Sequence, residues 1–440
     1  MNKPATINHK TLAIHGGTNA LFRLGVIFGM IVTNAIVARL LTPTDAGLYI
    51  QYWSLAGFLA LAGNLGLRTS SVRWIATALH RGSPAEARAA LVSTLWMSHC
   101  AFLTVGIGFY LISEIGKRFL PMSLHVDHLS LVLIASWIIL WGMQYTLSES
   151  FRGFSGHLSA GLTGGLFSNA AFVLSVLLQW MMGYEFHIKL MIATTVVALA
   201  INYIIIMTIA ARILFGLPRG GHWDIRSSWG QTLLVSISQL ALGAMQLLDV
   251  WVVGIVAGPA ESALYGFASR IAVLVSLPLQ IVYSTALPSL TTASCQHDPI
   301  ALQRMVRNAG TAALVPGLVF ALVLGCFGSF LLPLLYGEQY AQASNYLRWL
   351  VLFQLIVVAG GLAGGLLLAS GNELVSVKLN VVTAIVCIVA QLLSGFYFGP
   401  TAVPITSCLV VMGFVISQSY VCRKLFQIEC LPFLPQWKSS

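Results

Sequence analysis

The chain has 440 residues, of which 58% are hydrophobic and only 8% are charged, and its formal net charge is +10. Soluble domains carry about 25% charged residues because their surfaces face water, so the composition excludes a soluble catalytic domain and predicts an all-α membrane protein. The basic residues lie in short loops between long apolar runs, where the positive-inside rule accounts for them. We therefore expect no nucleic-acid partner.

Twelve apolar runs are long enough to cross a bilayer, for which a helix needs about 20 apolar residues. In chain order they cover residues 19–41, 46–66, 89–112, 129–149, 158–183, 190–213, 229–256, 263–290, 309–335, 344–369, 379–398 and 403–421. The connections are short, so the sequence predicts about 12 transmembrane helices joined as antiparallel hairpins.

The distribution of Lys and Arg predicts the orientation of these helices. If the N-terminus is cytoplasmic, 17 basic residues lie on the cytoplasmic side and 4 on the opposite side. Cytoplasmic loops carry the excess of basic residues. We therefore expect both termini in the cytoplasm.

A short motif after the first span recurs after the seventh. The residues Pro43, Asp45, Leu48 and Tyr49 match Pro259, Glu261, Leu264 and Tyr265, each pair 216 residues apart. Parallel repeats of this kind build some transporters, so we predict two six-helix lobes around a central cavity. The predicted divisions are an N-terminal tail (1–18), a first lobe (19–213), an inter-lobe loop (214–228), a second lobe (229–421) and a C-terminal tail (422–440).

Two charged residues lie inside predicted spans on either side of one loop. Asp249 and Arg270 each lie about eight residues from the loop at 257–262, which places both about 12 Å from the same end of a helical hairpin. This equal depth permits an ion pair. The pair either joins the two spans or faces the cavity, where Arg270 meets an anionic substrate and Asp249, the candidate for ion coupling, takes a proton.

Arg23 and Arg348 are the other candidates for the substrate cavity. Each lies near the end of a span, where a long basic side chain either extends to the lipid headgroups or lines the substrate path. A guanidinium group binds phosphate through paired donors, so arginines in a path fit an anionic substrate. Neutral amides within the spans, Gln246 among them, either line a path for sugars or bond neighbouring helices.

The sequence contains no H-E-x-x-H, Walker A, G-x-S-x-G or DxD-type motif. The stretch His125–His128 could bind a metal, but it has no further ligands nearby and fits an ordinary interfacial loop better. We therefore expect no enzyme activity, no catalytic residue, no cofactor and no metal. The glycine-rich stretch at 360–365 lies within an apolar run, and its small residues predict a face for close helix packing.

Several stretches in a fixed order are typical of one family of membrane proteins. They are Ala38–Tyr49 (A-R-x-L-x-P-x-D-x-G-x-Y), Leu248–Gly254 (D-x-x-x-V-G), Leu264–Arg270 (Y-x-x-A-x-R), Ala286–Leu290 (P-x-L), Leu332–Tyr340 (a G-x-x-Y loop) and Ala369–Asn372 (A-x-G). With these patterns the chain resembles the polysaccharide transporter branch of the multidrug/oligosaccharidyl-lipid/polysaccharide exporter superfamily, the O-antigen flippase-like proteins.

The resemblance implies a flippase of the bacterial inner membrane that serves O-antigen, capsule or exopolysaccharide assembly. Its substrate would be undecaprenyl-pyrophosphate-linked oligosaccharide, moved by alternating access, with membrane lipid, a polysaccharide polymerase and a chain-length regulator as expected partners. Two alternatives stay open at this point, a multidrug exporter of the same superfamily and a membrane polysaccharide polymerase.

Overall fold

The computed structural model describes residues 9–117, 127–224, 229–283 and 299–430, and every regular element in these ranges is a helix. The predicted all-α fold is confirmed. The Ala286–Leu290 part of the family pattern lies outside the described residues.

By their internal packing the residues form two compact units, 1–33 with 62–232 and 34–61 with 233–440. The second unit therefore includes the turn between the first two helices. The division into two six-helix lobes remains a prediction.

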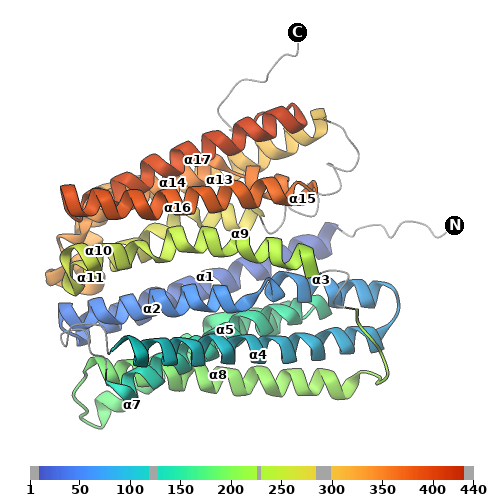
Figure 1. The fold of residues 1–440 in the computed structure, drawn as a ribbon, viewed down its shortest axis with the longest axis horizontal. Helices are drawn as coiled ribbons and strands as arrows, with labels where there is room; N and C mark the ends of the chain where they lie inside the picture. The colour runs from blue at the N-terminus through green and yellow to red at the C-terminus, as the bar shows by residue number, and fades with distance from the viewer. Residues whose placement is uncertain (1–8, 118–126, 225–228, 284–298, 431–440) are drawn as a thin grey trace. The chain divides into compact units, whose positions relative to one another are not determined.

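The first unit consists of helices that pack as antiparallel neighbours. The helices are the first part of α1 (His9–Leu40), the end of α2 (Pro43–Asn64), α3 (Leu67–His80), α4 (Pro84–Gly116), α5 (His128–Ser150), the turn η2 (Phe151–Phe154), α6 (His157–Gly161), the π-helical turn η3 (Leu162–Leu166), α7 (Phe167–Met181) and α8 (Ile188–Gly216). Helix α5 packs against α3, α4 and α8, and Figure 1 shows α4, α5 and α8 running side by side. The side chains on α5 thus face several other helices of the unit.

The second unit is built in the same way. Its helices are the remainder of α1 and α2, α9 (Trp229–Leu247), α10 (Asp249–Ala257), α11 (Pro259–Ala272) continued by η5 (Val273–Ser276), α13 (Pro299–Tyr336), η6 (Glu338–Tyr340), α14 (Ala343–Gly360), α15 (Ala363–Ala369), α16 (Glu373–Phe398) and α17 (Ala402–Phe426). Helix α14 contacts α11, α13 and α17, and α17 also contacts α16 (Figure 1).

Eleven helices in the described residues are long and apolar enough to cross a membrane. The second predicted span, 46–66, corresponds to α2, a helix of 22 residues that is not among these eleven. The chain is therefore a multi-pass membrane protein.

The structure corrects the sequence prediction at three places. Residues 67–80, expected in a loop, form α3 after a turn at Gly66, whose φ of 76° is left-handed. The predicted span 158–183 contains the π-helical turn, where Gly165 has φ 147°. The predicted span 344–369 is broken at Gly361 (φ 58°), between α14 and α15. Glycine readily adopts a positive φ, so each of these glycines lets the chain turn or break within an apolar stretch. Hydropathy does not distinguish such a glycine from one inside a regular helix.

The two copies of the sequence repeat begin helices that pack against each other. Pro43 is the first residue of α2 and Pro259 the first of α11, as suits a residue without an N–H at a helix start. A Cβ added to Gly266 would lie 2.3 Å from the Ile50 side chain. The Arg270 side chain reaches Ser54, 216 residues away, at 3.4 Å. Ile50 and Gly266 are also 216 residues apart, so both contacts join equivalent positions of the two copies of the repeat. Contacts between equivalent positions are expected around a two-fold axis.

The end of α1 is tied to the end of α13 by hydrogen bonds to backbone carbonyls. The Arg39 guanidinium donates to Leu335 O at 3.0 Å and to Leu334 O at 2.6 Å. The Gln339 amide donates to Ala38 O at 2.9 Å. The last carbonyls of a helix lack intrahelical partners, so Arg39 completes the C-terminus of α13.

We expect Gly47→Ala to destabilise the protein by about 1–3 kcal/mol, because an added Cβ would lie 1.7 Å from the Pro259 carbonyl oxygen and force α2 away from α11. The measurement is the thermal unfolding midpoint of the purified protein in detergent.

The matched control is Gly325→Ala on α13, where nothing lies within 4 Å of the added Cβ. Alanine favours a helix over glycine by about 1 kcal/mol, so this variant should unfold at the wild-type midpoint or above. Equal midpoints for the two variants would contradict the close approach of α2 and α11.

Candidate functional site

Three arginines of the first unit gather around one glutamate. Glu149, near the end of α5, lies 2.8 Å from Arg152 Nε and 3.8 Å from Arg68 Nη2. Arg68 Nη1 donates to the Tyr145 hydroxyl at 2.6 Å, and its guanidinium carbon lies 4.0 Å from the centre of the Tyr145 ring. The side chains of Arg68 and Arg152 are therefore held in place from α5.

Arg23 of α1 is the third arginine of this group. The positive charges of Arg152 and Arg68 repel its guanidinium, and the carboxylate of Glu149 attracts it. Its Nε is buried and has no hydrogen-bond partner among the described residues. We call Arg23, Arg68, Arg152 and Glu149 the arginine cluster. Its three cations and one carboxylate carry a net charge of +2.

The local sequence explains how Arg68 reaches this position. The Asn64 side chain accepts a hydrogen bond from the Arg68 backbone N–H at 3.0 Å, and its amide donates to Thr146 at 3.0 Å. The start of α3 is thereby joined to α5 one turn before Glu149. A free guanidinium N–H beside two fixed guanidinium groups binds an anion by charge-assisted hydrogen bonds.

Asp249 lies in the second unit and is bonded by two donors. The Tyr265 hydroxyl donates to Asp249 Oδ2 at 2.7 Å, and the Val250 N–H donates to Oδ1 at 2.8 Å. The side chain is 6% exposed. A buried carboxylate held in this way is suited to taking up a proton or a small cation.

Arg270 lies on an aromatic ring rather than against Asp249. Its guanidinium carbon is 3.5 Å from the centre of the Trp53 ring, and Nη2 donates to Ser54 at 3.4 Å. The two side chains are not within ion-pair distance in the described structure, so the pair that the sequence permits does not form. Arg270 instead joins α11 to α2 through a cation–π contact.

A second carboxyl–tyrosine pair lies beside Asp249. The Tyr346 hydroxyl donates to Glu261, and the Tyr346 ring meets the Tyr265 ring edge-on, with centroids 5.5 Å apart. The two acidic residues are thus linked through two tyrosines in contact. In the sequence, Asp249 is a candidate site residue and Tyr265 belongs only to the repeat and the family pattern. No pattern in the sequence marks Tyr346.

Arg348 is exposed on α14 and belongs to neither group. Of the four site residues expected from the sequence, the structure places Arg23 in the arginine cluster and Asp249 and Arg270 near the α2–α11 contact. The sequence did not identify Arg68, Glu149 or Tyr145 as site residues, because they meet only after α3 and α5 pack. Among the described residues no group of His, Cys, Asp and Glu is placed to hold a metal ion.

Comparison with solved structures shows the fold. The chain is similar to a multidrug resistance MATE family transporter of the MOP superfamily in an inward-facing conformation, with TM-score 0.72, 16% identity, and 93% and 98% of the two chains covered. It is also similar to a mutant of the Vibrio cholerae MATE transporter VcmN (TM-score 0.68, 17% identity, 97% and 98% covered). A MOP superfamily transporter from Pyrococcus furiosus matches with TM-score 0.63, 16% identity and 94% of each chain covered.

Comparison by sequence shows the family. The amylovoran biosynthesis protein AmsL of Erwinia amylovora is 26% identical over 198 residues, which are 43% of this chain and 49% of AmsL, so the match spans about half of that relative. The MatE family model matches residues 235–393. The polysaccharide biosynthesis protein family model matches residues 21–293, more than half of the chain. The resemblance seen in the sequence is confirmed, and the chain belongs to the polysaccharide biosynthesis protein family.

Proposed function

We propose that this protein is a flippase that moves undecaprenyl-pyrophosphate-linked oligosaccharide across the bacterial inner membrane. The observation that carries the proposal is the arginine cluster, with its net positive charge and the unpaired Nε of Arg23. Charged groups within membrane-spanning helices are costly and are retained where they act on a substrate. The pyrophosphate is the charged part of such a substrate and would be bound by the arginines.

Family membership and fold also support this function, independently of the site residues. The family is one of polysaccharide biosynthesis, and the similar solved structures are of transporters rather than of enzymes. In this proposal the substrate is a lipid-linked sugar, whose lipid tail would remain in the bilayer. Alternating access would move the sugar, with a polymerase and a chain-length regulator acting on the product.

A multidrug exporter is the second candidate, because the MatE family model covers the segment that contains the buried Asp249. An exporter of cationic drugs requires an acidic binding site, and the arginine cluster would repel such a substrate. The polymerase alternative is an enzyme, and the similar solved structures do not support it.

Leaflet-resolved analysis of lipid-linked oligosaccharide in cells that lack this protein tests the proposal. Intermediates trapped on the cytoplasmic side, with loss of surface polysaccharide, are the expected result. Normal translocation with unpolymerised single repeats would indicate the polymerase instead. Normal surface polysaccharide with greater sensitivity to cationic drugs would indicate the exporter.

We expect Arg23→Gln to lower translocation at least tenfold. Charge-assisted hydrogen bonds contribute about 1.5–3 kcal/mol, and the neutral amide cannot replace the guanidinium charge. Translocation is measured in the deletion cells complemented with each variant at matched expression.

Arg73→Gln is the control for loss of one positive charge, since Arg73 is exposed on α3, the helix that carries Arg68. It should translocate at the wild-type rate. Equal rates for Arg23→Gln and Arg73→Gln would show that the arginine cluster does not bind the substrate.

We also propose that Asp249 couples transport to an ion gradient. Asp249→Asn retains the shape of the side chain but removes its charge, so transport should lose its dependence on an imposed proton or sodium gradient. The measurement is uptake by inverted membrane vesicles with and without each gradient.

Tyr265→Phe separates the charge of Asp249 from its hydrogen bond. This variant removes the bond to Oδ2 but leaves the carboxylate, so it should keep the ion dependence. An Asp249→Asn variant with unchanged transport and unchanged ion dependence would rule out this role.

A further inference from the structure

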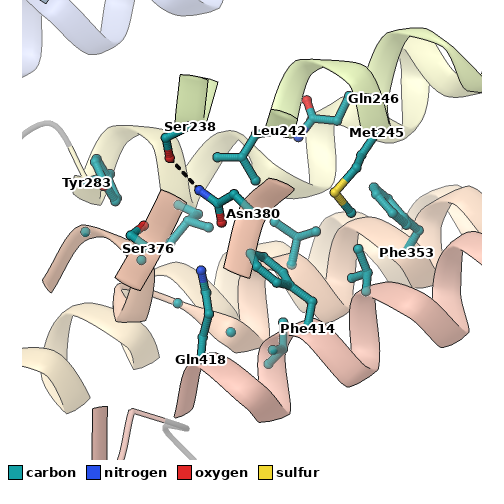
Figure 2. A pocket seen from close by; sticks show the side chains of 18 residues that line it. Ser238, Leu242, Met245, Gln246, Tyr283, Phe353, Ser376, Asn380, Phe414 and Gln418 are labelled. Atoms are coloured by element: carbon teal, nitrogen blue, oxygen red, sulfur yellow. Dashed lines mark hydrogen bonds between the residues drawn. The ribbon is translucent and has the colours of Figure 1, made fainter. Parts of the chain in front are cut away.

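The second unit contains a cavity of about 250 Å³ whose lining includes none of the charged residues described so far. Figure 2 shows the side chains that surround it, which come from α9, α14, α15, α16, α17 and the helical segment that contains Tyr283. Pockets for drug-sized ligands have volumes of about 300–1,000 Å³. The cavity therefore fits a smaller chemical group, such as a single sugar ring.

The described residues that line this cavity include no acidic or basic side chain. The polar residues among them carry amides and hydroxyls, namely Ser238, Gln246, Tyr283, Ser376, Asn380 and Gln418. Burying an unpaired charge in such surroundings is strongly unfavourable. The lining therefore selects against cations and anions and accepts a neutral polar ligand.

Two buried polar atoms of the lining have no hydrogen-bond partner among the described residues. They are Asn380 Oδ1 and Ser376 Oγ, on side chains that are 2% and 1% exposed. The Asn380 amide donates its other bond to Ser238, and the Gln418 amide points from α17 toward Asn380 (Figure 2). Other buried atoms of the described residues, such as Trp74 Nε1 and Asn202 Oδ1, also have no hydrogen-bond partner, but only these two belong to residues that line the cavity. A ligand with several hydroxyl groups would satisfy both of them.

Apolar groups supply the rest of the surface. Phe353, Phe414 and Tyr283 present aromatic rings to the cavity. An apolar lining with a few fixed polar groups is the usual composition of a ligand pocket. A sugar ring matches it because its C–H faces are apolar and its hydroxyl groups are polar.

The glycine-rich stretch forms part of the wall. Gly360, Gly361, Gly364 and Gly365 line the cavity at the break between α14 and α15. A Cβ on Gly365 would lie 2.7 Å from the Tyr283 ring, so the glycine allows the ring to lie there. Irregular backbone at membrane depth is found where it is buried in protein or lines a cavity. The expected helix-packing face is thus also the wall of a pocket.

We propose that this pocket binds one neutral sugar ring of the transported oligosaccharide, an inference that rests on the proposed function. The sugar would be held by Asn380 and Ser376 and would pack on the aromatic rings. The arginine cluster and this pocket would then recognise different parts of the substrate, the pyrophosphate and the sugar.

Saturation-transfer NMR on the full chain in lipid nanodiscs, which avoid sugar-headed detergents, tests this proposal. The probes are D-glucose and D-galactose, compared with D-glucuronate and D-glucosamine, which differ chiefly in charge. We expect binding of at least one neutral hexose with millimolar affinity, typical of so small a ligand. Absence of hexose binding, or equal binding of the charged analogues, would overturn the proposal without any variant.

Ser376→Ala removes a hydroxyl that has no partner among the described residues, so the variant should fold normally. It should weaken hexose binding roughly threefold to tenfold, the usual effect of one neutral hydrogen bond. Ser417→Ala, on the exposed face of α17, is the control and should bind like the wild type. Equal affinity of Ser376→Ala and wild type would refute the assignment of the pocket.

The two proposals fail in distinguishable ways. Arg23-dependent translocation without hexose binding would overturn the sugar pocket alone. Hexose binding in a protein whose deletion leaves lipid-linked oligosaccharide translocation normal would overturn the proposed function, while the sugar specificity of the pocket would stand.

Discussion

The lack of water inside a bilayer is the constraint on which this structure depends. Each backbone N–H and C=O at that depth needs a partner within the protein, and a helix provides it within one segment. Every regular element in the described residues is accordingly a helix. At the end of α13, where no further helix turn follows, the exposed Arg39 guanidinium donates to two of the last carbonyls.

Two of the charged side chains buried in the second unit likewise have partners within the protein. Asp249 receives two hydrogen bonds and Arg270 lies on Trp53, so both charges are accommodated. The buried polar atoms without a hydrogen-bond partner among the described residues include Arg23 Nε in the arginine cluster and Ser376 Oγ and Asn380 Oδ1 in the pocket, the two places proposed to contact substrate. A charged substrate group suits the arginine cluster, because ionised side chains form it. A neutral group suits the pocket of the second unit, because its polar lining consists of amides and hydroxyls.

Glycine allows the backbone conformations and close helix contacts on which three parts of the structure depend. Gly66 turns the chain so that α3 starts beside α5 and brings Arg68 to Glu149. Gly361 ends α14 where the pocket in the second unit requires an irregular wall. Gly47 lets α2 approach the start of α11, where equivalent residues of the repeat meet. Each position depends on a missing Cβ or on a positive φ, which other residues rarely provide.

The sequence by itself determined the class of the protein, most of its spans and its family, because hydropathy and ordered motifs are properties of local stretches. It also offered Arg23, Asp249, Arg270 and Arg348 as candidates for the site, since a charge within an apolar run stands out. Only the tertiary structure decided that Glu149 gathers Arg68 and Arg152, that Arg270 meets Trp53 rather than Asp249, and that the glycine-rich stretch lines a pocket. These groupings join residues on separate helices, and their distances depend on how the helices pack and where they break, which no local pattern records.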